Sequence, residues 1–122
     1  MPAWKWTASV PKRGDVYMAR LDPREGSEQA GERPVIIVSR DAINDYSSVV
    51  IVIPVTDRKH KKRIYPSQVV LKKGDGGLTK DSVALGEQVR AVSTSRFRRQ
   101  LGRLNPGSLR QIAEALRIAL DL

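Results

Sequence analysis

The sequence predicts a mainly β protein: a small curled antiparallel sheet or barrel followed by one C-terminal helix. Two observations support this fold class. Several short segments rich in β-branched residues are separated by Gly, Pro and Asp turns, and only the C-terminal segment has strong helical periodicity. At 122 residues the chain fits one domain with a real core. We expect that domain to span residues 13–122, after an N-terminal extension, residues 1–12, that carries Trp4 and Trp6.

The first half of the domain contains the strongest strand signals. Residues 15–21 alternate apolar and polar side chains, as a half-buried strand does. The β-branched runs at 34–39 and 49–55 predict buried strands. Residues 24–32 form a glycine-bearing loop, and 41–46 are expected to make a helical turn that Asp41 caps.

The second half begins with a basic loop at 57–65, a short strand at 68–71 and a glycine turn at 73–77. Residues 82–92 predict one or two strands, with Gly86 as a bulge or a point of close backbone approach. A short helix is expected at 93–99 and a strand at 100–104.

The C-terminal helix has clear boundary signals. Asn105 suits the N-cap and Pro106 the first helical position. A core-facing stripe follows at helical spacing; its members are Leu109, Ile112, Ala113, Leu116 and Leu120.

The charge is strongly asymmetric along the chain. The net charge is +9, from 22 Lys and Arg against 13 Asp and Glu. Residues 1–57 hold seven basic and eight acidic groups, a net of −1, whereas 58–122 hold fifteen and five, a net of +10. This asymmetry favours a polyanionic partner, with nucleic acid ahead of an acidic protein segment.

The absence of cysteine excludes disulfides, thiol nucleophiles and cysteine-based zinc sites, and fits a reducing cytoplasm. Because His60 is the only histidine, His-rich metal sites and Ser-His-Asp catalysis have little support. No apolar run is long enough to span a membrane. We therefore expect a cytosolic protein that needs no metal or other cofactor and does not associate with membranes.

Polar residues at the ends of two predicted strands indicate an active site. Pro34 biases Arg33 toward an extended backbone, so the guanidinium sits at the start of a strand, where it can grip a phosphate. Thr56 ends the next strand, and Glu28 lies in the glycine-bearing loop. These groups suit attack of an RNA 2′-hydroxyl on its own 3′-phosphodiester, with Glu28 as the candidate base. Each residue also has a purely structural explanation.

The basic loop after Thr56 strengthens the RNA hypothesis. Five of its six residues from 58 to 63 carry a fixed positive charge, which suits a phosphate backbone and makes binding depend on salt. The candidate RNA contacts are Arg58, Lys59, Lys61, Lys62 and Arg63. A solvated flexible loop is the alternative explanation.

Four ordered motifs resemble the MazF/PemK toxins over residues 13–121. They are Arg13-Gly14-Asp15-Val16-Tyr17, residues 26–31 with Arg33-Pro34, Pro54-Val55-Thr56, and Asp81-Ser82-Val83 with Glu87-Gln88-Val89-Arg90. The resemblance implies an SH3-like PemK-type barrel, usually a homodimer, and a metal-independent endoribonuclease that cuts single-stranded RNA at short sequences. The implied products carry a 2′,3′-cyclic phosphate and a free 5′-hydroxyl.

By the same resemblance, Arg33 and Thr56 match the catalytic arginine and threonine of the family. Glu28 and Gln29 match loop residues near the scissile phosphate, and Gln88 and Arg90 border the RNA path and the dimer surface. The implied partner is an antitoxin whose acidic tail occupies the basic groove. The unusually basic loop and the N-terminal extension depart from the family pattern, so the cleavage sequence does not transfer.

Two alternatives stay open. One is a CcdB-like poison that binds gyrase on the same barrel, since fold alone does not determine function. The other is a non-catalytic RNA-binding module. The pairing of Arg33 with Thr56 favours the nuclease over both, because neither alternative needs that pair.

Overall fold

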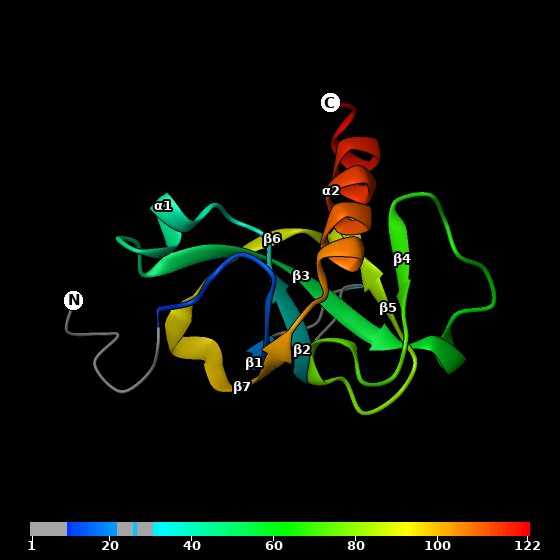
Figure 1. Cartoon of the computed structure of the whole chain (residues 1–122), viewed down its shortest axis with the longest axis horizontal. Coiled ribbons are helices and arrows are strands. Elements are labelled where there is room, and N and C mark those ends of the chain that lie inside the picture. Colours follow the sequence, from blue (N-terminus) through cyan, green and yellow to red (C-terminus); the bar gives the residue numbers. More distant parts are fainter. Residues whose placement is uncertain (1–9, 22–25, 27–30) are drawn as a thin grey trace.

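The computed structural model describes residues 10–21, 26 and 31–122. In this part of the chain, seven strands form one antiparallel sheet and two α-helices accompany it (Figure 1). The elements are β1 (Asp15–Leu21), β2 (Gly31–Ile37), α1 (Asp41–Asn44), β3 (Val49–Asp57), β4 (Gln68–Leu71), β5 (Ser82–Leu85), β6 (Arg90–Ser93), β7 (Phe97–Arg103) and α2 (Pro106–Leu120). The predicted mainly β fold with a C-terminal helix is confirmed.

The long strand β3 organises the sheet. The strand order is β4-β5-β3-β2-β1-β7, and β6 also pairs with β3. The beginning of β3 pairs with β6, its middle with β2, and its end with β5. Strands β4 and β7 lie at opposite ends of the order, so the sheet stays open rather than closing into a barrel.

Alternation along the strands separates two hydrophobic clusters. Ile53 and Val55 of β3 belong to one cluster, whereas Val50 and Val52 belong to the other. Helix α2 contributes Ile112 and Ala115 to the first cluster and thereby covers that side of the sheet. The helix begins as predicted: the Asn105 side chain accepts the Ser108 N–H at 2.8 Å, with Pro106 at the first position.

The expected stripe on α2 is wrong at one position. Leu120 is 52% exposed, because the end of the helix extends beyond the sheet, and Ala115 is buried instead. The prediction for Gly86 is confirmed as a close approach: a Cβ there would lie 2.3 Å from the Ser67 carbonyl oxygen.

The helix predicted at 93–99 is also wrong. Only Thr94–Arg96 form a 3₁₀ turn, and β7 begins at Phe97. The Phe97 ring stacks on Tyr17 of β1 with centroids 4.8 Å apart, a long-range contact that favours the strand.

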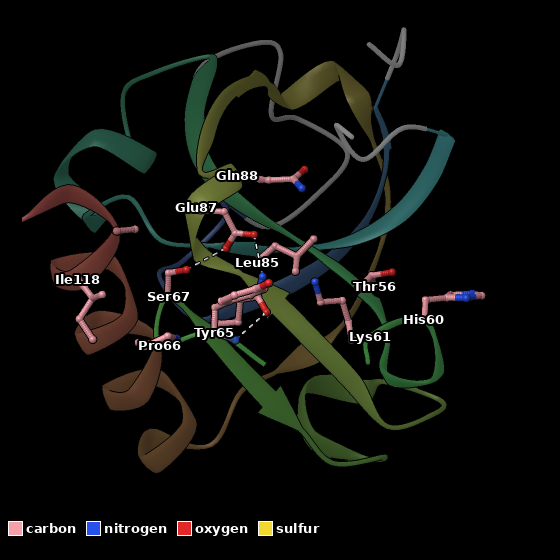
Figure 2. Close-up of a pocket in the computed structure, with 12 residues that line it drawn as sticks. Thr56, His60, Lys61, Tyr65, Pro66, Ser67, Leu85, Glu87, Gln88 and Ile118 are labelled. Carbon is pink, nitrogen blue, oxygen red and sulfur yellow. Dashed lines mark hydrogen bonds between the residues drawn. The ribbon is translucent and has the colours of Figure 1, made fainter. Parts of the chain in front are cut away.

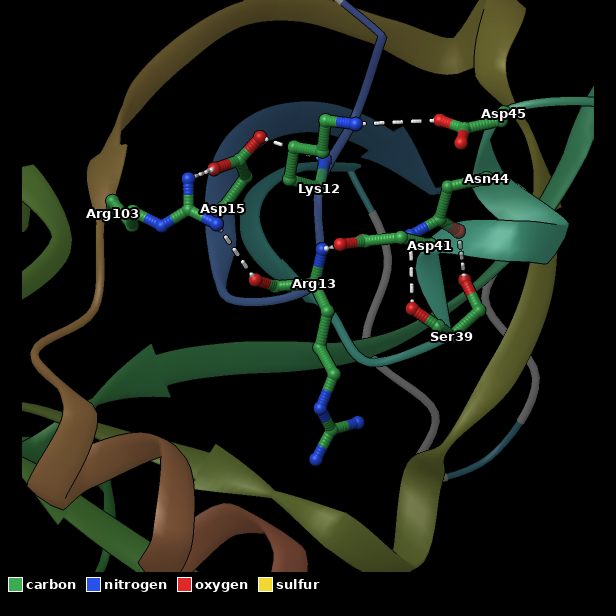
Figure 3. Close-up of polar contacts among 8 residues, drawn as sticks. All are labelled: Lys12, Arg13, Asp15, Ser39, Asp41, Asn44, Asp45 and Arg103. Atoms are coloured by element: carbon green, nitrogen blue, oxygen red, sulfur yellow. Dashed lines mark hydrogen bonds and ion pairs between the residues drawn. The ribbon is translucent and has the colours of Figure 1, made fainter.

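Asp41 does not cap α1, whose N-cap is Arg40 without a side-chain bond. Instead the Asp41 carboxylate accepts the backbone N–H of Arg13 at 2.8 Å and the Asn44 amide at 3.3 Å (Figure 3). The Arg13 bond is the main cause that holds the pKa of Asp41 below its usual value. Asp41 therefore ties the turn before β1 to α1.

Candidate active site

The two strongest sequence candidates, Arg33 and Thr56, lie together. Strands β2 and β3 pair with Val35 opposite Pro54, and the same register continued by two residues brings Arg33 level with Thr56. Both residues line a pocket of about 300 Å³. We call it the Lys80 pocket; its other charged residues are Glu32, Asp57, Lys59, Lys80 and Arg99.

A second pocket of about 760 Å³ lies beside Thr56 (Figure 2). We call it the Glu87 pocket. Thr56 and His60 line both pockets, so the two are adjacent. The other polar and aromatic residues of the Glu87 pocket are Lys61, Tyr65, Ser67, Gln68, Glu87 and Gln88.

Two hydrogen bonds hold the Glu87 carboxylate in place (Figure 2). It accepts the Gln68 amide at 2.8 Å and the Ser67 hydroxyl at 3.2 Å. The buried Gln68 side chain in turn accepts the Tyr65 N–H at 3.2 Å. An ionised carboxylate has further acceptor capacity, so Glu87 suits the N–H groups of a nucleobase.

The aromatic ring of the Glu87 pocket is Tyr65, which is half exposed. The ammonium of Lys61 lies 5.7 Å from its centroid, a cation–π distance. A half-exposed ring that lines a pocket suits stacking on a base. The sequence placed Glu87 in a family motif but did not predict it as a site residue, because its position depends on contacts with residues 67 and 68 that the sequence does not reveal.

Hydrogen bonds of Arg58 stabilise the conformation of the basic loop. The Arg58 guanidinium donates to the Lys61 carbonyl at 2.6 Å, and the Arg58 N–H donates to the Asp81 carbonyl at 3.0 Å. Arg58, predicted as an RNA contact, therefore holds the loop. Lys61 lines the Glu87 pocket, and Lys62 and Arg63 are exposed.

Asp57 positions two lysines at the Lys80 pocket. Its carboxylate accepts the Lys59 backbone N–H at 3.0 Å and lies 3.2 Å from the Lys80 ammonium and 3.8 Å from that of Lys59. The backbone bond is the largest cause that lowers the pKa of Asp57, and Lys80 adds to it. Asp57 therefore stays ionised and keeps both ammonium groups beside the pocket.

The remaining predicted site residues differ in placement. Gln88 lines the Glu87 pocket. Arg90 lies on β6 opposite Val52 and lines neither pocket. Glu28 and Gln29, like Trp4 and Trp6, lie outside the described residues.

Within the described part of the chain, no three His, Asp or Glu side chains gather as metal ligands would. Among these residues, no helix is both long enough and apolar enough to cross a membrane.

Known proteins resemble this chain in sequence and in fold. A curated relative, endoribonuclease MazF of Staphylococcus saprophyticus subsp. saprophyticus, is 42% identical over 111 residues, which cover 91% of this chain and 92% of that protein. A solved structure of MazF from Deinococcus radiodurans is 27% identical, with a TM-score of 0.78 and coverage of 93% of this chain and 99% of that one.

A second solved structure is an endoribonuclease from a Mycobacterial species in complex with its cognate antitoxin. It is 26% identical, with a TM-score of 0.74, and the match covers 92% of this chain and 96% of that chain. The family described as PemK-like, MazF-like toxins of type II toxin–antitoxin systems matches residues 12–120. Because this match spans nearly the whole chain and a close curated relative covers the same length, the protein belongs to the PemK-like, MazF-like family of type II toxins.

Proposed function

We propose that this protein is a sequence-specific endoribonuclease that cuts single-stranded RNA, including mRNA, without a metal ion. The main support for the proposal is that Arg33 and Thr56 line the same pocket. The chain is also 42% identical to an endoribonuclease. Both residues were candidates for phosphoryl chemistry because of their types and their positions at strand ends. Their proximity in the fold supports one joint site.

The proposed reaction uses a nucleophile that the substrate supplies. The ribose 2′-oxygen attacks the adjacent phosphorus, the 2′-oxygen–phosphorus bond forms, and the bond to the 5′-oxygen breaks. The 2′-hydroxyl proton passes to a base, for which Glu28 is the candidate, and the leaving 5′-oxygen takes up a proton. The products are a 2′,3′-cyclic phosphate and a 5′-hydroxyl, so neither water nor metal enters the step.

Arg33 and Thr56 act on the charge that develops at phosphorus. The guanidinium offers paired N–H donors to the phosphoryl oxygens and is the candidate proton donor to the leaving oxygen. The Thr56 hydroxyl donates to a non-bridging oxygen. Groups carried by paired strands are already oriented, so they stabilise the transition state without reorganising.

Substitution of Arg33 tests this proposal. Purified protein is expected to cleave, in EDTA, those members of a broad panel of single-stranded RNAs that contain its recognition sequence, and Arg33→Ala to reduce the rate by about 10²–10³-fold. Arg110→Ala, at an exposed position of α2, is the matched control and is expected to cleave at the wild-type rate. Intact RNA over the whole panel would remove the nuclease; wild-type rates for Arg33→Ala would remove the site.

An acidic antitoxin segment is the proposed protein partner. The net charge of +10 over residues 58–122 and the solved complex of a related toxin with its antitoxin support this pairing. Such a segment would order on the basic groove and compete with RNA. A synthetic acidic antitoxin tail should therefore inhibit cleavage competitively with RNA; non-competitive inhibition would place it elsewhere.

A homodimer is the proposed assembly. Val49 and Ile51, 46% and 38% exposed, share one face of β3, and Ile43 and Tyr46 lie exposed in and after α1. Exposed apolar side chains of this kind commonly mark protein interfaces. Sedimentation analysis should give twice the chain mass, and Ile51→Lys should give a monomer; a monomeric wild-type protein would exclude the assembly.

A further inference from the structure

We infer that Lys80 and Arg99 form a subsite within the Lys80 pocket, which holds a further RNA phosphate beside the cleaved phosphate at Arg33 and Thr56. This inference rests on the proposed function. It assigns a role to Lys80 and Arg99, two residues that the sequence did not single out. They lie 19 positions apart, on the segment before β5 and on β7, and both line this pocket.

The Lys80 pocket adjoins the Glu87 pocket, and this supports a continuous path for RNA. Thr56 and His60 line both, so a strand in the Glu87 pocket that crosses Thr56 continues directly into the Lys80 pocket. The Glu87 pocket offers a ring and a fixed carboxylate, which suit a base. The Lys80 pocket has four cationic side chains, which suit phosphates; they are Arg33, Lys59, Lys80 and Arg99.

The net charge of the Lys80 pocket also favours phosphate binding. The two carboxylates of the pocket are already engaged: Asp57 by Lys80 and Lys59, and Glu32 by Arg98 at 3.8 Å. Within the described part of the chain, Arg99 is exposed and has no ion pair. The pocket thus keeps an excess of positive charge, and Asp57 lies within ion-pair distance of both its ammonium groups.

Binding of single-stranded DNA tests the subsite apart from cleavage, because DNA lacks the 2′-hydroxyl nucleophile but keeps every phosphate. Affinity of a labelled DNA of about twelve nucleotides is measured by anisotropy between about 50 and 200 mM salt. Lys80→Gln and Arg99→Gln are each expected to weaken binding at low salt. Each should also reduce the slope of log affinity against log salt by about 0.7, the value for one lost phosphate contact on a single strand.

Arg110→Gln is the matched control, because this exposed arginine on α2 lines neither pocket. An unchanged slope in both pocket variants, or an equal loss in the control, would overturn the subsite. If the two pocket variants bind DNA as the wild type does but no longer bind an Asp/Glu-rich peptide, the subsite is overturned in favour of a protein partner. Wild-type RNA cleavage is measured in parallel. Cleavage with unchanged slopes refutes only the subsite, whereas reduced slopes without cleavage refute the proposed function.

Discussion

Replacing Thr56 with valine separates catalysis from folding. Thr56 is 6% exposed and pairs with Val83 between β3 and β5. Valine keeps the branched shape and the strand preference, so the backbone pairing is retained. Among the described residues, none forms a hydrogen bond with the Thr56 hydroxyl, so its removal leaves no described partner unsatisfied. We therefore expect the free energy of unfolding to change by less than about 1 kcal/mol.

The same substitution removes a donor to the phosphoryl oxygens. Loss of one such donor typically costs about 10²–10³-fold in rate, equivalent to about 2.7–4 kcal/mol in the transition state. Thr56→Ser is the matched variant, because it keeps the hydroxyl and loses one methyl group, worth about 0.8 kcal/mol of burial. Serine should therefore cleave RNA at nearly the wild-type rate but unfold more easily.

Single-turnover cleavage and urea unfolding of both variants give the comparison. The expected result is a stable but slow valine variant and a less stable but active serine variant. Valine that cleaves at the wild-type rate would refute the role of the hydroxyl. A valine variant as destabilised as it is inactive would instead show that Thr56 acts through packing.

Two further predictions concern the contribution of Gly77 and Asp57 to the stability of the protein. Gly77→Ala should destabilise the protein strongly, because φ is +77° and a Cβ would lie 2.0 Å from the Leu101 carbonyl oxygen. Gly74→Ala should destabilise it less, because the space around Gly74 is open and only the positive φ is unfavourable for alanine. Equal melting temperatures of the two variants would contradict this prediction. The pKa of Asp57 is held below its ordinary 3.8, so the stability that this carboxylate contributes is complete above that pH and is lost as pH falls below it. Asp57→Asn should flatten the unfolding free energy over that acidic range, and an unchanged pH profile would contradict the assignment.

Local patterns predicted the strands and the C-terminal helix because these elements follow from periodicity and capping. The runs at β2 and β3 and the Asn105 cap are of this kind. Long-range contacts explain the errors. Phe97 joins β7 and stacks on Tyr17, and the Asp41 carboxylate accepts the Arg13 N–H instead of capping α1.

The same distinction applies to the site. Arg33 and Thr56 were predicted because each stands at the end of a strong strand signal, and the sheet brings those ends together. Glu87 was missed because its place depends on bonds to Ser67 and Gln68, about twenty residues earlier. No local pattern reveals such a contact, nor that Arg99 and Lys80 line the same pocket.

The chemical ends of the products test the central claim most directly. Wild-type protein is incubated with single-stranded RNA in EDTA, and the fragments are examined by mass spectrometry. The account predicts 2′,3′-cyclic phosphate and 5′-hydroxyl ends, and full resistance of an RNA with one 2′-deoxynucleotide on the 5′ side of the cleaved bond. Fragments with 5′-phosphate and 3′-hydroxyl ends, or cleavage at the 2′-deoxy position, would contradict attack by the substrate's own hydroxyl.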